Sequence, residues 1–226
     1  MPTADDKAEH RKRIRQRMLD RGEAAFLDHE LLEYVLTLAV PRRDMKPLAK
    51  ELIRSFGSFA GAIAATPDDL RTVDGVGDAV VATLKLVEGA SLRLLKEGVA
   101  DRPLLGSWQA VQDYLHAAMA HKSREEFRVL ALDPKNVLMR DVVVSTGTVN
   151  QTAVHIREIV QLVLNLGATS IVLVHNHPSG DAKPSRDDIA LTARIGDVCR
   201  VLGIGLHDHV IIARGGSASF KSLGLL

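Results

Sequence analysis

A run of β-branched and apolar residues, Ser170–His175, is followed closely by a second histidine, His177, and by Pro178. Such a run predicts a buried strand, and Pro178 predicts that the strand ends there, because proline cannot continue a hydrogen-bonded ladder. Successive side chains of a strand point to opposite faces, so residues two apart share a face. We therefore expect the chain to bury a strand whose end presents His175 and His177 on one side.

A helix is expected to follow this strand after a polar loop. Ser185 is placed as its N-cap, and an apolar period continues the pattern at Ile189, Leu191, Ala193 and Ile195. Asp188 then lies in the first helical turn, where the loop can fold its carboxylate back beside the histidines. A lone H-x-H is typical of core hydrogen bonding or of a phosphate loop, but two imidazoles and a carboxylate form a three-ligand zinc set. The sequence therefore predicts one Zn²⁺ per chain, bound by His175, His177 and Asp188.

The fixed residues of this segment resemble the JAMM motif of the JAB/MPN metalloproteins, H-x-H-P-x6-S-x2-D, whose positions are met by His175, His177, Pro178, Ser185 and Asp188. Four stretches resemble the bacterial RadC proteins more narrowly: Ser145–Asn150, His155–Glu158, His175–Asp181 and Ser222–Leu226. The resemblance implies an α/β fold, with a three-layer JAB/MPN (cytidine-deaminase-like) domain that contains a mixed sheet. A small all-α helix-hairpin-helix domain is expected to precede it.

The same resemblance implies zinc-dependent hydrolysis of an amide, peptide or isopeptide bond, with an upstream glutamate as general base. Glu126, just before an apolar strand, best matches that glutamate, and the neighbouring Glu125 is expected to face the other way. Glu158 is a further candidate, although its place on an amphipathic helix favours an exposed or capping charge. The family pattern gives Ser185 a hydroxyl that assists the oxyanion, as an alternative to a role as N-cap alone.

A second H-x-H occurs at His207 and His209, before the apolar run Val210–Ala213. The strand argument applies here too, but no carboxylate follows at a spacing that a loop and helix would bring back. We therefore favour a hydrogen-bonding role beside the metal ligands for this segment over a second metal site. Asn176 is expected to face away from the histidines that flank it and to be structural.

The N-terminal half carries a glycine turn between two expected helices. In a helix-hairpin-helix, the outward N–H groups of such a turn, here Gly75, Val76 and Gly77, hold a DNA phosphate without reading sequence. Asp74 and Asp78 flank the turn and would repel a phosphate. Structural packing and weak, non-specific DNA contact therefore stand as equal alternatives for the hairpin.

A basic run, Arg11–Arg21, precedes this region and indicates either a solvated helix face or a phosphate-contacting arm. Together with the hairpin it supports a second function that the RadC resemblance implies. In that alternative the protein is a binding protein of DNA repair or recombination, and its metal domain is structural or vestigial.

The composition is that of an ordinary globular chain, with 46% hydrophobic and 25% charged residues among 226. Lysine and arginine total 29 against 28 acids, a net charge of +1 that excludes a globally basic nucleic-acid binder. The single cysteine, Cys199, is expected in the core and fits a reducing compartment. With no apolar leader or run of membrane-spanning length, we expect a cytoplasmic protein that does not enter the membrane and acts on a peptide or protein substrate.

Two domains are expected, an all-α domain over residues 1–100 and the zinc domain over 104–226, joined by a polar linker at 97–103. The second is expected to order its elements as helix, two strands, helix, strand, helix and two strands. Its strands are placed at 126–133, 137–146, 170–175, 206–213 and 218–220, and its first two helices at 107–121 and 153–166.

Overall fold

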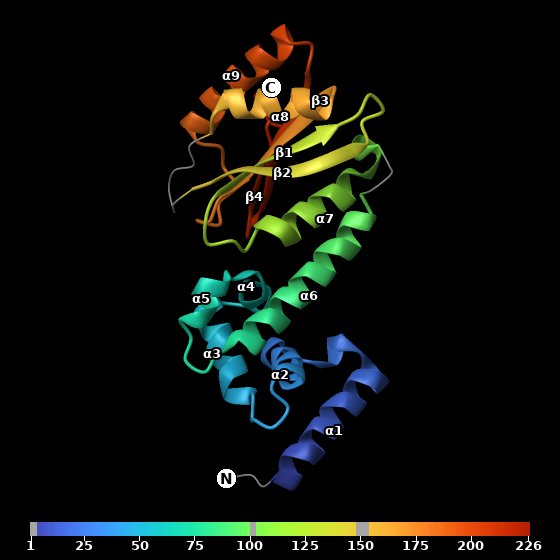
Figure 1. Ribbon diagram of the computed structural model, residues 1–226, viewed down its shortest axis with the longest axis vertical. Coiled ribbons are helices and arrows are strands. Elements are labelled where there is room, and N and C mark those ends of the chain that lie inside the picture. The colour runs from blue at the N-terminus through green and yellow to red at the C-terminus, as the bar shows by residue number, and fades with distance from the viewer. Residues whose placement is uncertain (1–3, 100–102, 148–153) are drawn as a thin grey trace. The chain divides into compact units, whose positions relative to one another are not determined.

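A computed structural model describes residues 4–99, 103–147 and 154–226 of the chain (Figure 1). Contacts between residues group the chain into two compact units, one up to Ser91 and the other from Leu92 onward. The change of unit falls within helix α6 (Asp78–Glu97). The division into domains at 1–100 and 104–226 stays a prediction, and residues 100–102 of the expected linker lie outside the described residues. None of the described helices is both long and apolar enough to cross a membrane.

The first unit is helical. Its core is built mainly from buried leucines, valines and alanines, among them Leu32, Leu36, Leu52, Leu70 and Leu84. The helices are α1 (Ala4–Arg21), the 3₁₀ helix η1 (Glu23–Ala25), α2 (Asp28–Ala39), α3 (Lys46–Phe56), α4 (Phe59–Ala64), α5 (Pro67–Arg71) and the start of α6.

The turn between α5 and α6 is the one in which the sequence predicts a hairpin. Thr66 caps α5, because its side chain accepts a hydrogen bond from the backbone N–H of Asp69 at 3.1 Å. Gly75 has a φ of 85°, a left-handed conformation that glycine adopts without strain. The short helix, turn and long helix thus occur in the expected order, and their assignment as a helix-hairpin-helix module stays a prediction.

The second unit contains a five-stranded mixed sheet. Its elements in chain order are η2 (Leu104–Ser107), α7 (Trp108–Met119), β1 (Glu126–Leu132), β2 (Leu138–Thr146), α8 (Ile156–Leu166), β3 (Ser170–Asn176), α9 (Arg186–Val201), β4 (Gly205–Ala213) and β5 (Gly216–Ser219). The strands are arranged in the order β2-β1-β3-β4-β5, with β3 and β4 parallel and every other neighbouring pair antiparallel. The expected α/β class and mixed sheet are confirmed.

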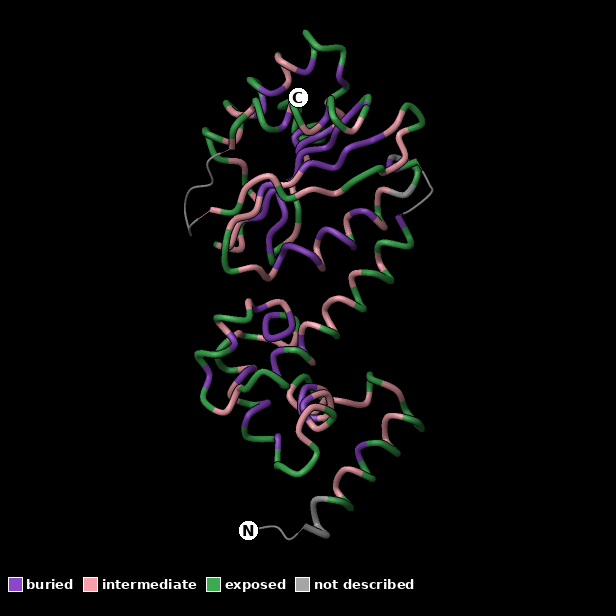
Figure 2. Tube along the Cα trace, viewed as in Figure 1, coloured by how far each residue is buried: buried purple, intermediate pink, exposed green. Residues whose placement is uncertain are grey.

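Helices cover both faces of this sheet. On one face α7 packs through Val111 and Leu115 against Leu130, Val172 and Val210. On the other, α8 and α9 pack against Val129 and Leu173, as the buried residues Ile159, Val163, Ile195 and Cys199 show. Figure 2 shows that buried residues gather in the sheet, and β3, which is covered on both sides, is buried along its whole length. Cys199 is a core residue, as expected.

The element boundaries agree closely with those expected, with one informative difference. The final strand is Gly216–Ser219 rather than 218–220, because Ala213 already pairs with Gly216 across a tight turn. Phe220 follows the strand and is buried. The expected first residue of α8 at 153 and the end of the Ser145–Asn150 stretch lie outside the described residues.

Candidate metal centre

Three potential metal ligands meet at the carboxyl end of β3. His175 is the sixth residue of the strand, and His177 follows one residue after the strand ends. Asp188 lies in the first turn of α9, three residues after the cap Ser185. One ligand atom from each residue lies within 4.8 Å of the other two, so the sequence-predicted set is brought together.

The separations within this group suit a tetrahedral zinc ion. The two Nε2 atoms of His175 and His177 are 3.0 Å apart. Nε2 of His175 lies 3.3 Å from Oδ1 of Asp188, and Nε2 of His177 lies 3.5 Å from Oδ2. Zinc bonds of about 2.0–2.1 Å at tetrahedral angles place neighbouring ligand atoms roughly 3.3 Å apart. The donor set and its spacing therefore fit zinc.

The start of α9 orients the carboxylate. Ser185 accepts a hydrogen bond from the backbone N–H of Asp188 at 3.1 Å, which confirms it as the N-cap. Its hydroxyl and its backbone N–H both donate to Oδ2 of Asp188, at 2.6 and 2.8 Å. Burial acts to raise the pKa of Asp188, but its contacts with His175, His177 and Ser185 outweigh it and hold the pKa well below its ordinary value. The carboxylate is ionised, as a metal ligand must be.

Both ligand imidazoles have a partner for the nitrogen that does not face the group. Nδ1 of His177 lies 2.8 Å from the carbonyl oxygen of Asp181, to which it donates. Nδ1 of His175 lies 2.8 Å from Nε2 of His209, which is fully buried. Burial is the main cause that lowers the pKa of His209 well below its ordinary value, so this ring is neutral. Such partners of the second nitrogen fix ring orientation in metal sites.

Asn176 fixes the start of β1 beside the site. Its Nδ2 donates to the carbonyl oxygen of Arg124 at 3.1 Å, and its Oδ1 accepts from the backbone N–H of Glu126 at 2.8 Å. The expectation that Asn176 is structural is confirmed. Because its two bonds bracket Glu125, the backbone of that residue is held against the end of β3.

Glu125 faces the histidines. Phe127 pairs with His175 in the antiparallel register of β1 and β3, and their rings stack with centroids 5.9 Å apart. Glu125 directly precedes β1, and the same alternation and register continued by two residues bring it opposite His177. The pKa of His177 is raised, first by its contact with the carboxylate of Asp188 and also by the charge of Glu125. Glu125 is thus the carboxylate beside the start of β1 whose charge acts on a candidate ligand.

Glu126, which the sequence indicated as the base, lies on the opposite face of β1. Its Oε1 is 2.8 Å from Nζ of Lys122, and its Oε2 is 2.8 Å from Nη2 of Arg128. Burial acts to raise the pKa of Glu126, but hydrogen bonds from these two cations outweigh it and lower the pKa. The structure does not bring Glu126 to the metal ligands, because neighbouring residues of a strand point to opposite faces. The other candidate, Glu158, is exposed in the first turn of α8.

The second H-x-H is divided by an irregularity in β4. Ile171 pairs with Leu206 but Val172 pairs with Asp208, so His207 is an inserted residue. His207 and His209 therefore do not share a face, contrary to the simple alternation expected of them. Nε2 of His207 bonds to Oδ1 of Asn136 at 2.7 Å, whereas His209 reaches the metal ligand His175.

One further side chain at the site was missed from the sequence. Thr192 on α9 places its hydroxyl oxygen 2.6 Å from Nδ1 of His209. The signal was present, because Thr192 follows Asp188 by four residues and so lies on the same face of the helix.

Comparison with known proteins places these residues in a family. The family model described as the RadC-like JAB domain matches residues 105–225. A protein of Rhodobacter capsulatus named UPF0758 protein is 50% identical over 213 residues, which covers 94% of this chain and 100% of the relative. The UPF0758 protein SPO0054 of Ruegeria pomeroyi is 46% identical over 218 residues, 96% of this chain and 97% of the relative.

Proposed function

Because this chain belongs to the RadC family of JAB-domain proteins, we propose that it is a zinc-dependent hydrolase that cleaves an amide, peptide or isopeptide bond. The observation that carries the proposal is the convergence of His175, His177 and Asp188 at separations suited to zinc. Three protein ligands leave a fourth position of a tetrahedral ion for water or substrate, as in catalytic sites. Zinc bound there would polarise a carbonyl group and lower the pKa of water.

The general base in this proposal is Glu125 rather than Glu126. Glu125 directly precedes β1, its backbone is bracketed by the two hydrogen bonds of Asn176, and its charge acts on His177. Its carboxylate accepts a proton from water as the water attacks, and returns that proton to the leaving amine nitrogen. Glu126 cannot exchange roles with it, since Lys122 and Arg128 hold its carboxylate on the far face.

Ser185 stabilises the oxygen of the substrate carbonyl. Its hydroxyl already lies within hydrogen-bonding distance of a ligand carboxylate, Oδ2 of Asp188. A hydroxyl can rotate to a new acceptor, and a hydrogen bond to the developing oxyanion would lower the barrier. The capping role and the catalytic role then belong to different states of one side chain.

A cleavage assay with matched variants tests the proposal. The zinc-loaded protein is incubated with a quenched fluorescent peptide library and with peptides that carry a lysine isopeptide bond. We expect Glu125→Gln to retain zinc and to lower the rate of any cleavage by at least about 10²-fold, the scale of a lost general base. Glu126→Gln serves as the control, with a rate close to wild type.

The outcomes separate the parts of the proposal. Equal rates for Glu125→Gln and wild type would remove Glu125 from the mechanism. Loss of zinc in Glu125→Gln would make this residue a ligand or a determinant of the fold. If zinc-loaded wild type cleaves neither substrate class, the hydrolase proposal fails and a structural role for the metal domain is favoured.

DNA binding by the N-terminal unit is the second candidate, and one observation favours it. The guanidinium of Arg43 lies so close to the hairpin that a Cβ added at Gly75 would approach its Nη2 to 2.8 Å. Asp78, which would repel phosphate, is paired with Arg71 at 3.1 Å. The turn therefore repels an anion less than its flanking aspartates indicate. The N–H groups of Gly75 and Gly77 are proposed as weak phosphate contacts, whereas the N–H of Val76 already donates to the carbonyl oxygen of Val73 at 3.1 Å.

Fluorescence anisotropy on a mixed-sequence duplex at two salt concentrations tests this candidate. We expect sequence-independent binding in the range of about 10⁻⁴–10⁻⁶ M that weakens steeply with salt. Asp78→Lys should tighten binding, since it adds a positive charge and releases Arg71. Asp197→Lys, which changes the charge of another ion-paired surface aspartate, is the control. Absence of binding at low salt, or the same response to both variants, would leave the hairpin as a packing element.

A further inference from the structure

A chain of hydrogen bonds runs from α9 to the ligand His175. The hydroxyl of Thr192 donates to the carbonyl oxygen of Asp188 at 2.6 Å, and the hydroxyl oxygen of Thr192 lies 2.6 Å from Nδ1 of His209. Nε2 of His209 lies 2.8 Å from Nδ1 of His175. Thr192 and His209 are 2% and 0% exposed, so water does not compete for these bonds.

The proton positions along this chain follow from the number of hydrogens available. The single hydroxyl hydrogen of Thr192 is used on the carbonyl oxygen, so its oxygen can only accept, and Nδ1 of His209 must carry the proton. A neutral imidazole has one N–H, so Nε2 of His209 accepts from Nδ1–H of His175. Nε2 of His175 is then left with a free lone pair on the side where His177 and Asp188 converge.

The surroundings of His209 hold the ring in this single orientation. One face stacks on Phe220 with centroids 4.6 Å apart, and Phe127 meets the ring edge to face at 5.5 Å. Rotation of the ring would break both hydrogen bonds.

We propose that Thr192 and His209 are positioning residues that select the tautomer of His175 in which Nε2 is free to bind the metal. The inference rests on the metal site of the proposed function and is independent of hydrolysis. It also assigns a role to the hydroxyl of Thr192, which determines which nitrogen of His209, and in turn of His175, carries the proton.

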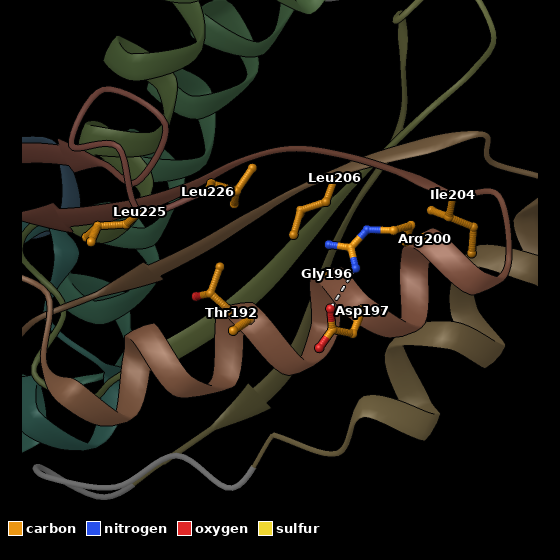
Figure 3. Close-up of a pocket in the computed structure, with 9 residues that line it drawn as sticks. Thr192, Gly196, Asp197, Arg200, Ile204, Leu206, Leu225 and Leu226 are labelled. Carbon is orange, nitrogen blue, oxygen red and sulfur yellow. Dashed lines mark hydrogen bonds and ion pairs between the residues drawn. The ribbon is translucent and has the colours of Figure 1, made fainter.

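Thr192 can be replaced by side chains of similar shape. Figure 3 shows it on α9 together with Gly196, one turn further along the helix, and Leu206. All three line a pocket of about 440 Å³. Thr192→Val keeps the shape and removes the hydroxyl, and Thr192→Ser restores the hydroxyl. Thr37→Val is the matched control, because Thr37 makes the same helical bond to a carbonyl four residues earlier, at 2.8 Å, within α2.

A second control tests whether a change of packing beside the hydrogen-bonded residues is enough to alter metal binding. Gly196→Ala adds a methyl group that would meet Leu206 at an ordinary contact distance of 3.6 Å. It changes the wall of the pocket beside Thr192 and leaves the hydrogen bonds that link Thr192, His209 and His175 in place. Both controls should bind metal as the wild type does.

Two readouts complete the test. Nitrogen-15 NMR of the metal-free protein should show His209 as the Nδ1–H tautomer in wild type and Thr192→Ser, and a mixture of tautomers in Thr192→Val. Competition with a chromophoric chelator for Zn²⁺ should give about 10- to 100-fold weaker binding for Thr192→Val, the scale of a lost partner of a metal-binding histidine. Thr192→Ser should recover most of that loss.

Each outcome decides a separate point. An Nε2–H tautomer of His209 in wild type, or unchanged zinc affinity in Thr192→Val, would overturn the inference. Equal losses in Thr192→Val and Gly196→Ala would do the same, since packing alone would then explain them. The expected tautomer in a wild type that binds no zinc would refute the metal function and the selection of a metal-binding tautomer, leaving only the proton order.

Discussion

Two polar clusters lie on opposite faces of β1, and they differ in how their charges are balanced. On the α7 face, Arg128 bonds to Glu126 at 2.8 Å and to Asp141 at 3.0 Å, and Lys122 completes the pairing of Glu126. Tyr114 donates to Asp141 at 2.6 Å. Burial, followed by the neighbouring Asp141, raises the pKa of Tyr114, so the phenol keeps its proton.

The cluster on the other face consists of acceptors. His175, His177 and Asp188 bring potential ligand atoms to one point, and Ser185 and His209 hydrogen-bond to Asp188 and His175 there. The α7 face holds two cations for two carboxylates, so its charges balance, although Oδ1 of Asp141 is buried without a hydrogen-bond partner among the described residues. The comparison indicates that burial and ionic character alone do not distinguish a candidate metal site, whereas convergence of potential ligands without a neighbouring cation does.

The largest expected difference between the two clusters is in metal content, because only changes to the candidate ligands should abolish zinc binding. Elemental analysis should find about one zinc per chain in the wild type and none in a His175→Ala, His177→Ala double variant, because two of three ligands are removed. His207→Ala is the control and should keep its zinc, since His207 bonds to Asn136 away from the ligands. Equal zinc in wild type and double variant would refute the site.

A smaller effect should appear in stability when the α7-face cluster is broken. Arg128→Met leaves Glu126 and Asp141 without their shared cation, and we expect the free energy of unfolding to fall by about 3 kcal/mol. Urea denaturation measures this loss, and zinc stoichiometry should not change. Arg200→Met removes one partner of an exposed pair, with 77% and 70% of the side chains accessible, and should cost about 0.5 kcal/mol or less. A zinc loss in Arg128→Met would show that the two faces are coupled.

The smallest effect concerns pH. The pKa of Glu126 is lowered in the folded protein, so its ion pairs contribute stability above the pKa of the unfolded state, about 4.3, and lose it as pH falls through the folded value. The free energy of unfolding of the wild type should therefore exceed that of Glu126→Gln by about 1 kcal/mol at pH 7, and this difference should disappear in more acidic solution. Urea titrations at pH 7 and below pH 4 check this, and a constant gap would contradict it.

The convergence of the three candidate ligands could be predicted because their placement follows local rules. His175 and His177 are two residues apart at a strand end that Pro178 marks, so alternation alone puts them together. Ser185 is a cap whose helix carries Asp188 three residues later, and that spacing also follows from local geometry.

The base and the second H-x-H depended on pairing between strands. Glu125 and Glu126 are adjacent, and the apolar residues that follow them are buried on both faces of the strand. The sequence therefore does not indicate which of the two glutamates points toward α8 and α9. The register of Phe127 with His175 decides it. In the same way, the inserted residue His207 follows from the pairing of β4 with β3, which no local pattern reveals.

The carboxylate of Asp188 belongs to two structures at once, a helix start and a ligand set. Its Oδ2 closes the capping box with Ser185, while its Oδ1 lies 3.3 Å from the ligand nitrogen of His175. The conformational entropy of this ligand is therefore lost when the chain folds, before any ion arrives. Zinc capture should then be close to a rigid-body encounter. Conversely, amide hydrogens in the first turn of α9 should exchange faster in Ser185→Ala, and zinc should slow that exchange in both proteins.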